Sequence, residues 1–251
     1  MGMERIYVEE FGVGAPLLVL LHGQGANGDV WNGLRPFIGR NWPGRCLVPD
    51  LRGHGRSPHR PPYAYGTYAA DIAELIDAEE AVLVGHSLGG AVAMTLAGGM
   101  FGATVRRVVA FGVKVNWTAD ELARRGQLAR QPVRWFDRRE DAIERYLKVS
   151  GQSGLVDPGA PAASSGVAEE NGRFRLAADP RIAGGGAVPD IVAIRRAARA
   201  PVTLAVGGHD PMVPLADAYA LDPGTSVLGE AGHNAHIERP DLIWDLIITA
   251  L

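Results

Sequence analysis

One serine in this chain has the neighbours that serine chemistry requires. Ser87 lies two residues after Gly85 and two residues before Gly89, in the segment VGHSLGG. The apolar run before it predicts a strand, and the Ala/Gly/Met-rich stretch after it predicts a helix. A serine on such a turn is typical of a nucleophile elbow, where the backbone is strained and a Cβ at either glycine would collide with a neighbouring element. The turn exposes the hydroxyl to a cleft, where the Leu88 N–H at the helix N-terminus can stabilise negative charge.

The elements around this serine alternate between apolar strands and helical segments. A weak edge strand is expected at 5–11, and stronger strands are expected at 17–21, 46–48, 81–84, 108–113, 201–206 and 226–228. Helices are expected at 30–38, 68–78, 91–100 and 241–251. This alternation predicts an α/β fold with a mostly parallel central sheet and helices on both faces.

The alternation is interrupted between residues 115 and 190. The segments 122–128 and 142–149 look helical and charged, whereas 151–172 is rich in Gly, Ala, Ser and Pro without apolar periodicity. We interpret 115–190 as a small, mainly helical cap insertion over the top of the sheet. Residues 1–114 and 191–251 would then form the core domain.

Size and charge exclude several classes of protein. With 251 residues, 47% of them apolar, the chain can form one substantial core. A net charge of −3 without a long Lys/Arg run indicates no nucleic-acid partner. The single cysteine, Cys46, rules out an intramolecular disulfide and a Cys-rich metal site. Because no signal-peptide pattern or membrane-span pattern is found, we expect a soluble cytoplasmic protein with no membrane partner.

On these motifs and this order of elements, the chain resembles the α/β-hydrolase superfamily, and within it the carboxylesterase-like serine hydrolases. In that family an acid and then a histidine follow the serine, each on a loop after a later strand. The loop GGHDPMVP after 201–206 carries Asp210, which matches the family's acid. The segment AGH after 226–228 carries His233, which matches the family's base. The resemblance therefore implies a catalytic triad of Ser87, Asp210 and His233.

Each residue type has a defined part in this chemistry. A serine hydroxyl is a weak nucleophile until an imidazole accepts its proton, and a carboxylate holds that imidazole in the required tautomer. An imidazole has an ordinary pKa of about 6.5, so it can accept a proton and return it to the leaving group. The resemblance assigns the loop HGQG at 22–25 to the oxyanion hole, with the Gln24 N–H as a donor beside that of Leu88. Such a donor typically lowers the barrier by about 3 kcal/mol.

Other titratable residues have alternative interpretations. His236 is the rival of His233 as the base, and the Gly-His motif favours His233. Asp217 is expected on a solvated helix, and His209 as a loop spacer. Because no histidine pair has helical ligand spacing with a supporting carboxylate, neither a metal nor another cofactor is expected.

Residues beside the key loops have structural interpretations. His22 and His86 are expected to shape their loops by hydrogen bonding. Asp50 and Arg52 are expected to order the glycine-rich loop that follows the strand at 46–48 by charge-assisted bonds.

Aromatic residues of the insertion are candidates for an apolar substrate pocket, namely Trp117, Trp135, Phe136 and Tyr146. The alternative is that they form the small core of the cap itself, since apolar linings are common to pockets and cores.

The combined expectation is a cofactor-independent serine hydrolase that cleaves a small or medium carboxylic ester through an acyl-enzyme intermediate. Lactone hydrolysis, carbon–carbon bond hydrolysis, acyl transfer and perhydrolysis use the same triad and remain alternatives. Serine at position 87 argues against the dehalogenase and epoxide-hydrolase branches, which require an aspartate there. A function of another class is a ligand receptor with slow or no turnover. The sequence makes no prediction of the oligomeric state.

Overall fold

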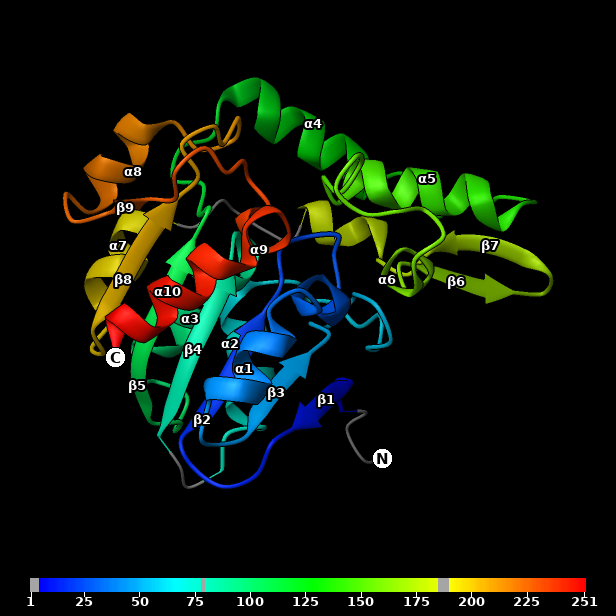
Figure 1. Cartoon of the computed structure of the whole chain (residues 1–251). Coiled ribbons are helices and arrows are strands. Elements are labelled where there is room, and N and C mark those ends of the chain that lie inside the picture. The colour runs from blue at the N-terminus through cyan, green and yellow to red at the C-terminus, as the bar shows by residue number, and fades with distance from the viewer. Residues whose placement is uncertain (1–4, 78–79, 185–189) are drawn as a thin grey trace.

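A mostly parallel sheet forms the centre of the molecule. The computed structural model describes residues 5–77, 80–184 and 190–251. Among these residues, seven strands form the sheet in the order β1-β3-β2-β4-β5-β8-β9 (Figure 1). β1 pairs antiparallel with β3 at one edge, and the other neighbours are parallel, as the sequence predicts. The strands are β1 (Val8–Phe11), β2 (Leu17–Leu21), β3 (Cys46–Pro49), β4 (Ala81–His86), β5 (Val105–Phe111), β8 (Val202–Val206) and β9 (Ser226–Val227).

Both faces of the sheet are buried, and strand β2 shows why its sequence is apolar throughout. Leu17, Val19 and Leu21 belong to one hydrophobic cluster, whereas Leu18 and Leu20 belong to another on the opposite face. Helices α2 (Tyr65–Ala73), α3 (Leu88–Leu96) and α7 (Ile191–Ala197) cover the first face. The second face is covered by η1 (Gly28–Trp31), α1 (Arg35–Asn41), α9 (Ala235–Glu238) and α10 (Pro240–Ala250). Helix α8 (Leu215–Leu221) packs beside the end of β8.

Three helix predictions need correction. The helix expected at 91–100 is α3, which starts three residues earlier and ends at Leu96. The single helix expected at 30–38 is wrong, because η1 and α1 are separate elements joined by a turn. Pro36 is tolerated in the first turn of a helix and not in its interior, so the longer helix must start again beside it. The helix expected at 68–78 is α2, which starts three residues earlier and ends at Ala73; residue 78 lies outside the described residues.

The segment between β5 and α7 forms a cap beyond the ends toward which the parallel strands point (Figure 1). Its elements are α4 (Ala119–Ala129), α5 (Arg139–Val149), α6 (Pro161–Ser164), β6 (Val167–Glu170), β7 (Arg173–Leu176) and η2 (Pro180–Gly184). The β6–β7 hairpin is absent from the sequence-based expectation, which treats 151–172 as irregular. The cap boundaries at 115 and 190 stay a prediction, and residues 185–189 lie outside the described residues.

The loops expected to carry chemistry follow β2, β4, β8 and β9. Because these strands are parallel, their carboxyl ends meet at one edge of the sheet, which is the edge beneath the cap. None of the helices in the described part of the chain combines the length and the hydropathy that a membrane crossing requires.

Candidate active site

The turn between β4 and α3 holds Ser87 in a strained conformation. Its φ of 51° and ψ of −113° lie in a region that L-residues rarely adopt. A Cβ on Gly85 would come within 2.4 Å of the Gly89 backbone, and a Cβ on Gly89 within 2.1 Å of the Leu21 carbonyl oxygen. The predicted steric role of both glycines is confirmed. The strand and the helix can therefore approach closely enough to present Ser87 at the cavity described below.

The acid and the histidine identified by resemblance form a hydrogen-bonded pair. Asp210 Oδ2 lies 2.8 Å from His233 Nδ1, which leaves the other ring nitrogen for a second partner. The Asp210 side chain is fully buried, and its Oδ1 accepts the N–H groups of Met212 at 2.8 Å and Val213 at 3.1 Å. Ser87 and His233 line the same cavity. The fold thus brings the three residues together from loops that are distant in sequence.

The loop after β2 lies against the elbow, and His22 fixes its geometry. The Leu51 N–H donates to His22 Nε2 at 2.9 Å, so the proton of the neutral ring is on Nδ1, which donates to the Gly23 carbonyl at 2.8 Å. Burial lowers the pKa of His22 and keeps the ring neutral. The Gly23 carbonyl and the Gln24 N–H belong to one trans peptide, so holding the first orients the second.

Two backbone N–H groups at this loop and the elbow suit an oxyanion. Among the described residues, the Gln24 N–H donates to no other protein group. The Leu88 N–H is in the first turn of α3, where no carbonyl of the same helix is available to it. Both residues line the cavity together with Ser87. These are the two donors expected from the sequence.

Two buried histidines pack next to the candidate base, with His86 edge-on to His233 and tilted against His236. The His86 ring lies 4.7 Å from that of His233 and 4.5 Å from that of His236, which in turn lies 4.8 Å from Trp31. Burial lowers the pKa of His86 well below its usual range and that of His236 to about 3. His236 is fully buried beside Trp31 and is absent from the cavity wall, which favours His233 as the base. The neutral neighbours add no positive charge beside His233.

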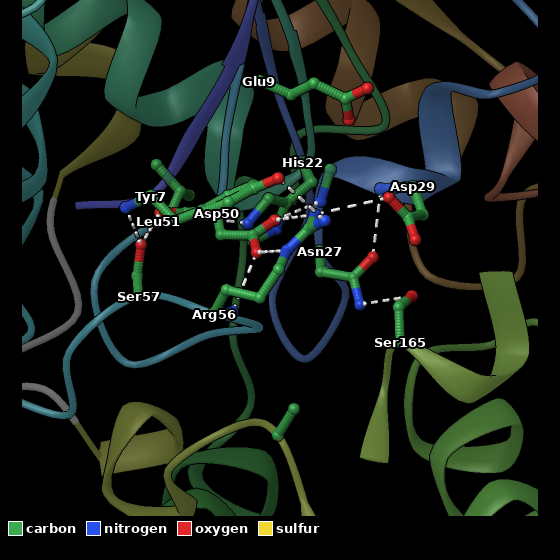
Figure 2. A network of polar contacts seen from close by, with 12 residues as sticks. Tyr7, Glu9, His22, Asn27, Asp29, Asp50, Leu51, Arg56, Ser57 and Ser165 are labelled. Atoms are coloured by element: carbon green, nitrogen blue, oxygen red, sulfur yellow. Dashed lines mark hydrogen bonds and ion pairs between the residues drawn. The ribbon is translucent and has the colours of Figure 1, made fainter. Parts of the chain in front are cut away.

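A network centred on Asp50 anchors the candidate oxyanion loop to the loop after β3 (Figure 2). Asp50 accepts the Gly28 N–H at 2.7 Å, and it accepts both the backbone N–H and the Nε–H of Arg56 at 2.8 Å. Burial, the largest single influence, would raise the pKa of Asp50, but the hydrogen bonds from Arg56 and Gly28 and the interaction with His22 together outweigh it and lower the pKa. Arg52 forms a bidentate pair with Asp71 on α2. The charge-assisted bonds expected for Asp50 and Arg52 are present, whereas their partners were not identified from the sequence.

A cavity of about 490 Å³ lies between the sheet edge and the cap. The core contributes the candidate catalytic groups and an aromatic wall from the start of α2, and the cap contributes parts of α4 and the end of α5. Its size suits a small organic ligand.

The aromatic residues proposed for the pocket lie in different places. Trp117 lines the cavity. Phe136 and Tyr146 belong to the hydrophobic cluster of the cap, where the Tyr146 hydroxyl accepts from Gln152 Nε2 at 3.0 Å. Trp135 is half-buried and is not among the cavity-lining residues. Phe136 and Tyr146 therefore belong to the small core of the cap, which was the alternative to a place in the substrate pocket.

Two asparagines that sequence reasoning missed join the core loops to the cap. Asn234, the residue after the candidate base, donates to the Gly151 carbonyl at 2.8 Å at the end of α5. Asn27 in the loop after β2 donates to Ser165 Oγ at 3.1 Å (Figure 2). Adjacency to His233 was the one sequence signal for Asn234, and Asn27 had none. Both bonds hold the cap over the cavity.

A mostly parallel sheet with a positive-φ serine at an elbow, an Asp–His pair at later strand ends and a glycine-rich loop beside the serine defines the α/β-hydrolase architecture. Residues 18–246 match the family described as the alpha/beta hydrolase family. The chain therefore belongs to the alpha/beta hydrolase family.

Individual relatives are similar over parts or all of the chain. An uncharacterized protein of Mycobacterium tuberculosis is 40% identical over 86 residues, which cover 33% of this chain and 25% of that protein. Pimeloyl-(acyl-carrier protein) methyl ester esterase of Aeromonas hydrophila is 43% identical over 94 residues, which cover 37% and 35%. The matches thus span about a quarter to a third of these curated relatives. The crystal structure of E-2-(acetamidomethylene)succinate hydrolase has a TM-score of 0.80 at 26% identity and covers 97% of this chain and 93% of that chain.

Proposed function

We propose that the chain is a serine hydrolase that cleaves a small or medium carboxylic ester. The observation that carries the proposal is the Asp210–His233 hydrogen bond of 2.8 Å, in which His233 shares a cavity with the strained Ser87. The similarity to a methyl ester esterase supports an ester over other acyl compounds. The reaction needs no cofactor, because the protein's own groups supply the nucleophile, the base and the oxyanion donors.

In the proposed mechanism, His233 Nε2 accepts the Ser87 proton while Oγ forms a bond to the ester carbonyl carbon. The Gln24 and Leu88 N–H groups hold the resulting oxyanion. The bond to the alcohol oxygen then breaks, and His233 returns the proton to the alcohol. A water molecule gives its proton to His233 while its oxygen forms a bond to the acyl carbon. The bond between that carbon and Ser87 Oγ then breaks, and His233 returns the proton to Oγ, which releases the acid and restores Ser87. Asp210 holds the imidazole and stabilises its cation throughout.

The test combines covalent labelling with turnover. A fluorophosphonate should attach one phosphonyl group to the wild-type protein, detected by mass spectrometry, and none to Ser87→Ala. The rate of p-nitrophenyl butyrate hydrolysis should fall by about 10⁴-fold or more in that variant. Ser153→Ala is the matched control, because Ser153 is an exposed serine of the cap. Undiminished esterase activity in Ser87→Ala would refute the proposal.

Further substrates separate the alternatives that share the triad. Turnover of a lactone without turnover of p-nitrophenyl esters of any chain length would favour a lactonase. Stabilisation by a ligand in a thermal-shift screen, without turnover of any substrate, would favour the slow receptor.

A further inference from the structure

The wall of the active-site cavity is positively charged. Three cationic side chains, Lys114, Arg125 and Lys148, line it, and none of its described lining residues is an aspartate or a glutamate. The Asp210 carboxylate lies behind His233 and is fully buried. A ligand in the cavity therefore meets cations and no exposed carboxylate.

The three cations are not equivalent. Lys114 donates to Glu121 at 2.7 Å, and that carboxylate also closes the N-terminal capping box of α4. Lys148 is exposed near the end of α5, where water and salt screen its charge. Arg125 is half-buried and, within the described part of the chain, pairs with no carboxylate. It is therefore the cation with the most to gain from an anionic partner.

Three arginines of the core that are buried or half-buried have a carboxylate partner at hydrogen-bond distance, in the pairs made by Arg35, Arg52 and Arg195. Half-buried arginines without such a pair among the described residues also occur, at Arg60, Arg107 and Arg145, and none of these three lines the active-site cavity. Burial lowers the pKa of Arg125, which expresses the cost of its charge in this position. Arg125 thus combines a half-buried guanidinium without a carboxylate partner with a position on the cavity wall, where a ligand would bind.

An aromatic ring holds the Arg125 guanidinium in place. Its Cζ lies 4.3 Å from the ring centroid of Trp117, a geometry typical of a cation–π contact. Stacking on a ring face leaves the N–H donors at the edge of the guanidinium available to acceptors in its plane. The positive charge also acts on Tyr65, another residue of the cavity wall, because it opposes the rise in the pKa of Tyr65 that burial causes. Trp117 therefore orients the Arg125 guanidinium, whose N–H donors and positive charge act within the cavity.

We propose that Arg125 is a specificity-determining residue that binds a second, anionic group of the substrate, a carboxylate or a phosphate. The substrate class is then an ester with a negative charge at the end remote from the scissile bond. This proposal rests on the proposed hydrolase function for the reaction but concerns a separate binding interaction. A planar guanidinium suits either anion, since both offer paired oxygen acceptors.

The kinetic test uses two esters of nearly equal shape. The mono-p-nitrophenyl ester of adipic acid carries a terminal carboxylate, and p-nitrophenyl 6-methylheptanoate replaces it with an isopropyl group. In Arg125→Met, kcat/KM for the adipate ester should fall about 10- to 100-fold, the range for loss of a hydrogen bond to a charged group. The fall for the neutral ester should be at least about tenfold smaller. Arg125→Lys should recover part of the preference for the adipate ester over the neutral ester, because lysine keeps the positive charge but lacks the paired N–H donors of a guanidinium.

Arg124→Met is the matched control, because Arg124 is an exposed arginine on the same helix and is absent from the cavity wall. It should leave the preference for the adipate ester unchanged. Equal losses for both esters in Arg125→Met would overturn the proposal, since they would indicate a purely structural role for the stack on Trp117. A wild-type protein without preference for the adipate ester would also overturn it.

A binding measurement separates this proposal from the proposed hydrolysis. Calorimetry on Ser87→Ala with monomethyl adipate or butyl phosphate requires no turnover. Binding that is lost when Arg125→Met is added supports the anion site even if the wild-type protein hydrolyses no ester, and the tighter probe identifies the anion. Ester hydrolysis combined with binding that is independent of Arg125 overturns the anion site and leaves the hydrolase function standing.

Discussion

Replacing His22 with phenylalanine tests whether the geometry of the proposed oxyanion loop contributes to catalysis. The change keeps a flat ring but removes the hydrogen bonds of 2.8 Å to the Gly23 carbonyl and 2.9 Å from the Leu51 N–H. Once the carbonyl loses this partner, the peptide plane that carries the Gln24 N–H can rotate, and the donor turns away from Ser87. Stability and turnover should therefore both change, for different reasons.

The structure sets the size of each effect. A buried Leu51 N–H without a partner costs about 1–3 kcal/mol of unfolding free energy. Complete loss of an oxyanion donor costs about 3 kcal/mol of activation free energy, or about 100-fold in kcat. The Ala26 N–H still donates to the Gly23 carbonyl at 3.3 Å, so part of the loop geometry persists. We expect kcat to fall about 10- to 100-fold while KM changes less than about threefold.

The assay is steady-state hydrolysis of p-nitrophenyl butyrate at a temperature where the variant is folded, with urea unfolding measured in parallel. His54→Phe is the control, because the His54 ring is also buried and packs 5.0 Å from the His22 ring, but its hydrogen bond is to the Arg52 carbonyl and not to the Gly23–Gln24 peptide. It should lose stability and keep its kcat. A His22→Phe variant with kcat within twofold of the wild type, or an equal fall in His54→Phe, would refute the reasoning.

The remaining predictions concern acid stability, the cap and the elbow. Burial depresses the pKa of four histidines below the value in the unfolded chain, so each ring contributes stability above about pH 6.5 that is lost as the pH falls toward its folded-state pKa, with a limiting slope of about 1.4 kcal/mol per pH unit. Urea unfolding between pH 7 and pH 5 measures this slope for His22, His54, His86 and His236. Asn234→Ala removes the bond to Gly151 and should lower kcat/KM about 10- to 100-fold by loosening the base, without abolishing fluorophosphonate labelling. Gly89→Ala should prevent soluble expression or abolish activity, because its Cβ meets the Leu21 carbonyl oxygen at 2.1 Å, whereas Gly39→Ala, with open space around it, should raise thermal stability.

The elbow and the sheet could be predicted from the sequence because their sequence signatures are local. Gly85 is required by its contact with Gly89 inside the turn and Gly89 by its contact with Leu21 at the end of β2, yet both glycines flank Ser87 at a fixed spacing. The strand β2 is apolar because both of its faces are buried. Each of these requirements is expressed in a few adjacent residues. The roles of Asp210 and His233 were predicted from the resemblance to the α/β-hydrolase family, whose acid and histidine follow the serine in this order on loops after later strands.

Some local signals were present and were not used. Asn171 and Gly172 both have positive φ and form the two-residue turn between Glu170 and Arg173, the pairing that Asn-Gly favours in a β-hairpin. Pro36 likewise indicated the start of a helix within the single helix expected at 30–38. Attention to both would have identified the hairpin β6–β7 and the break between η1 and α1.

The roles of Asn234 and Arg125 could not be predicted, because they depend on contacts between the cap and the core. An arginine on the charged segment 122–128 looks like any solvated helix residue until its distance to Trp117 is known. Similarly, an asparagine after a histidine gives no indication that a carbonyl more than 80 positions away will be its partner. Tertiary structure, and not periodicity, determines which polar side chains line a cavity.

The asparagine bonds also restrict how this fold can be recombined with others. A cap transplanted from a related protein would need a carbonyl where Gly151 accepts from Asn234 and a hydroxyl where Ser165 accepts from Asn27. Without them, two buried amides would lose their acceptors, one of them directly beside the candidate base. Chimaeras should therefore keep Gly151 and Ser165 whichever parts of the cap they exchange. With both contacts in place, cap residues that line the cavity, such as Trp117, can be changed to alter specificity without disturbing the loop that carries His233.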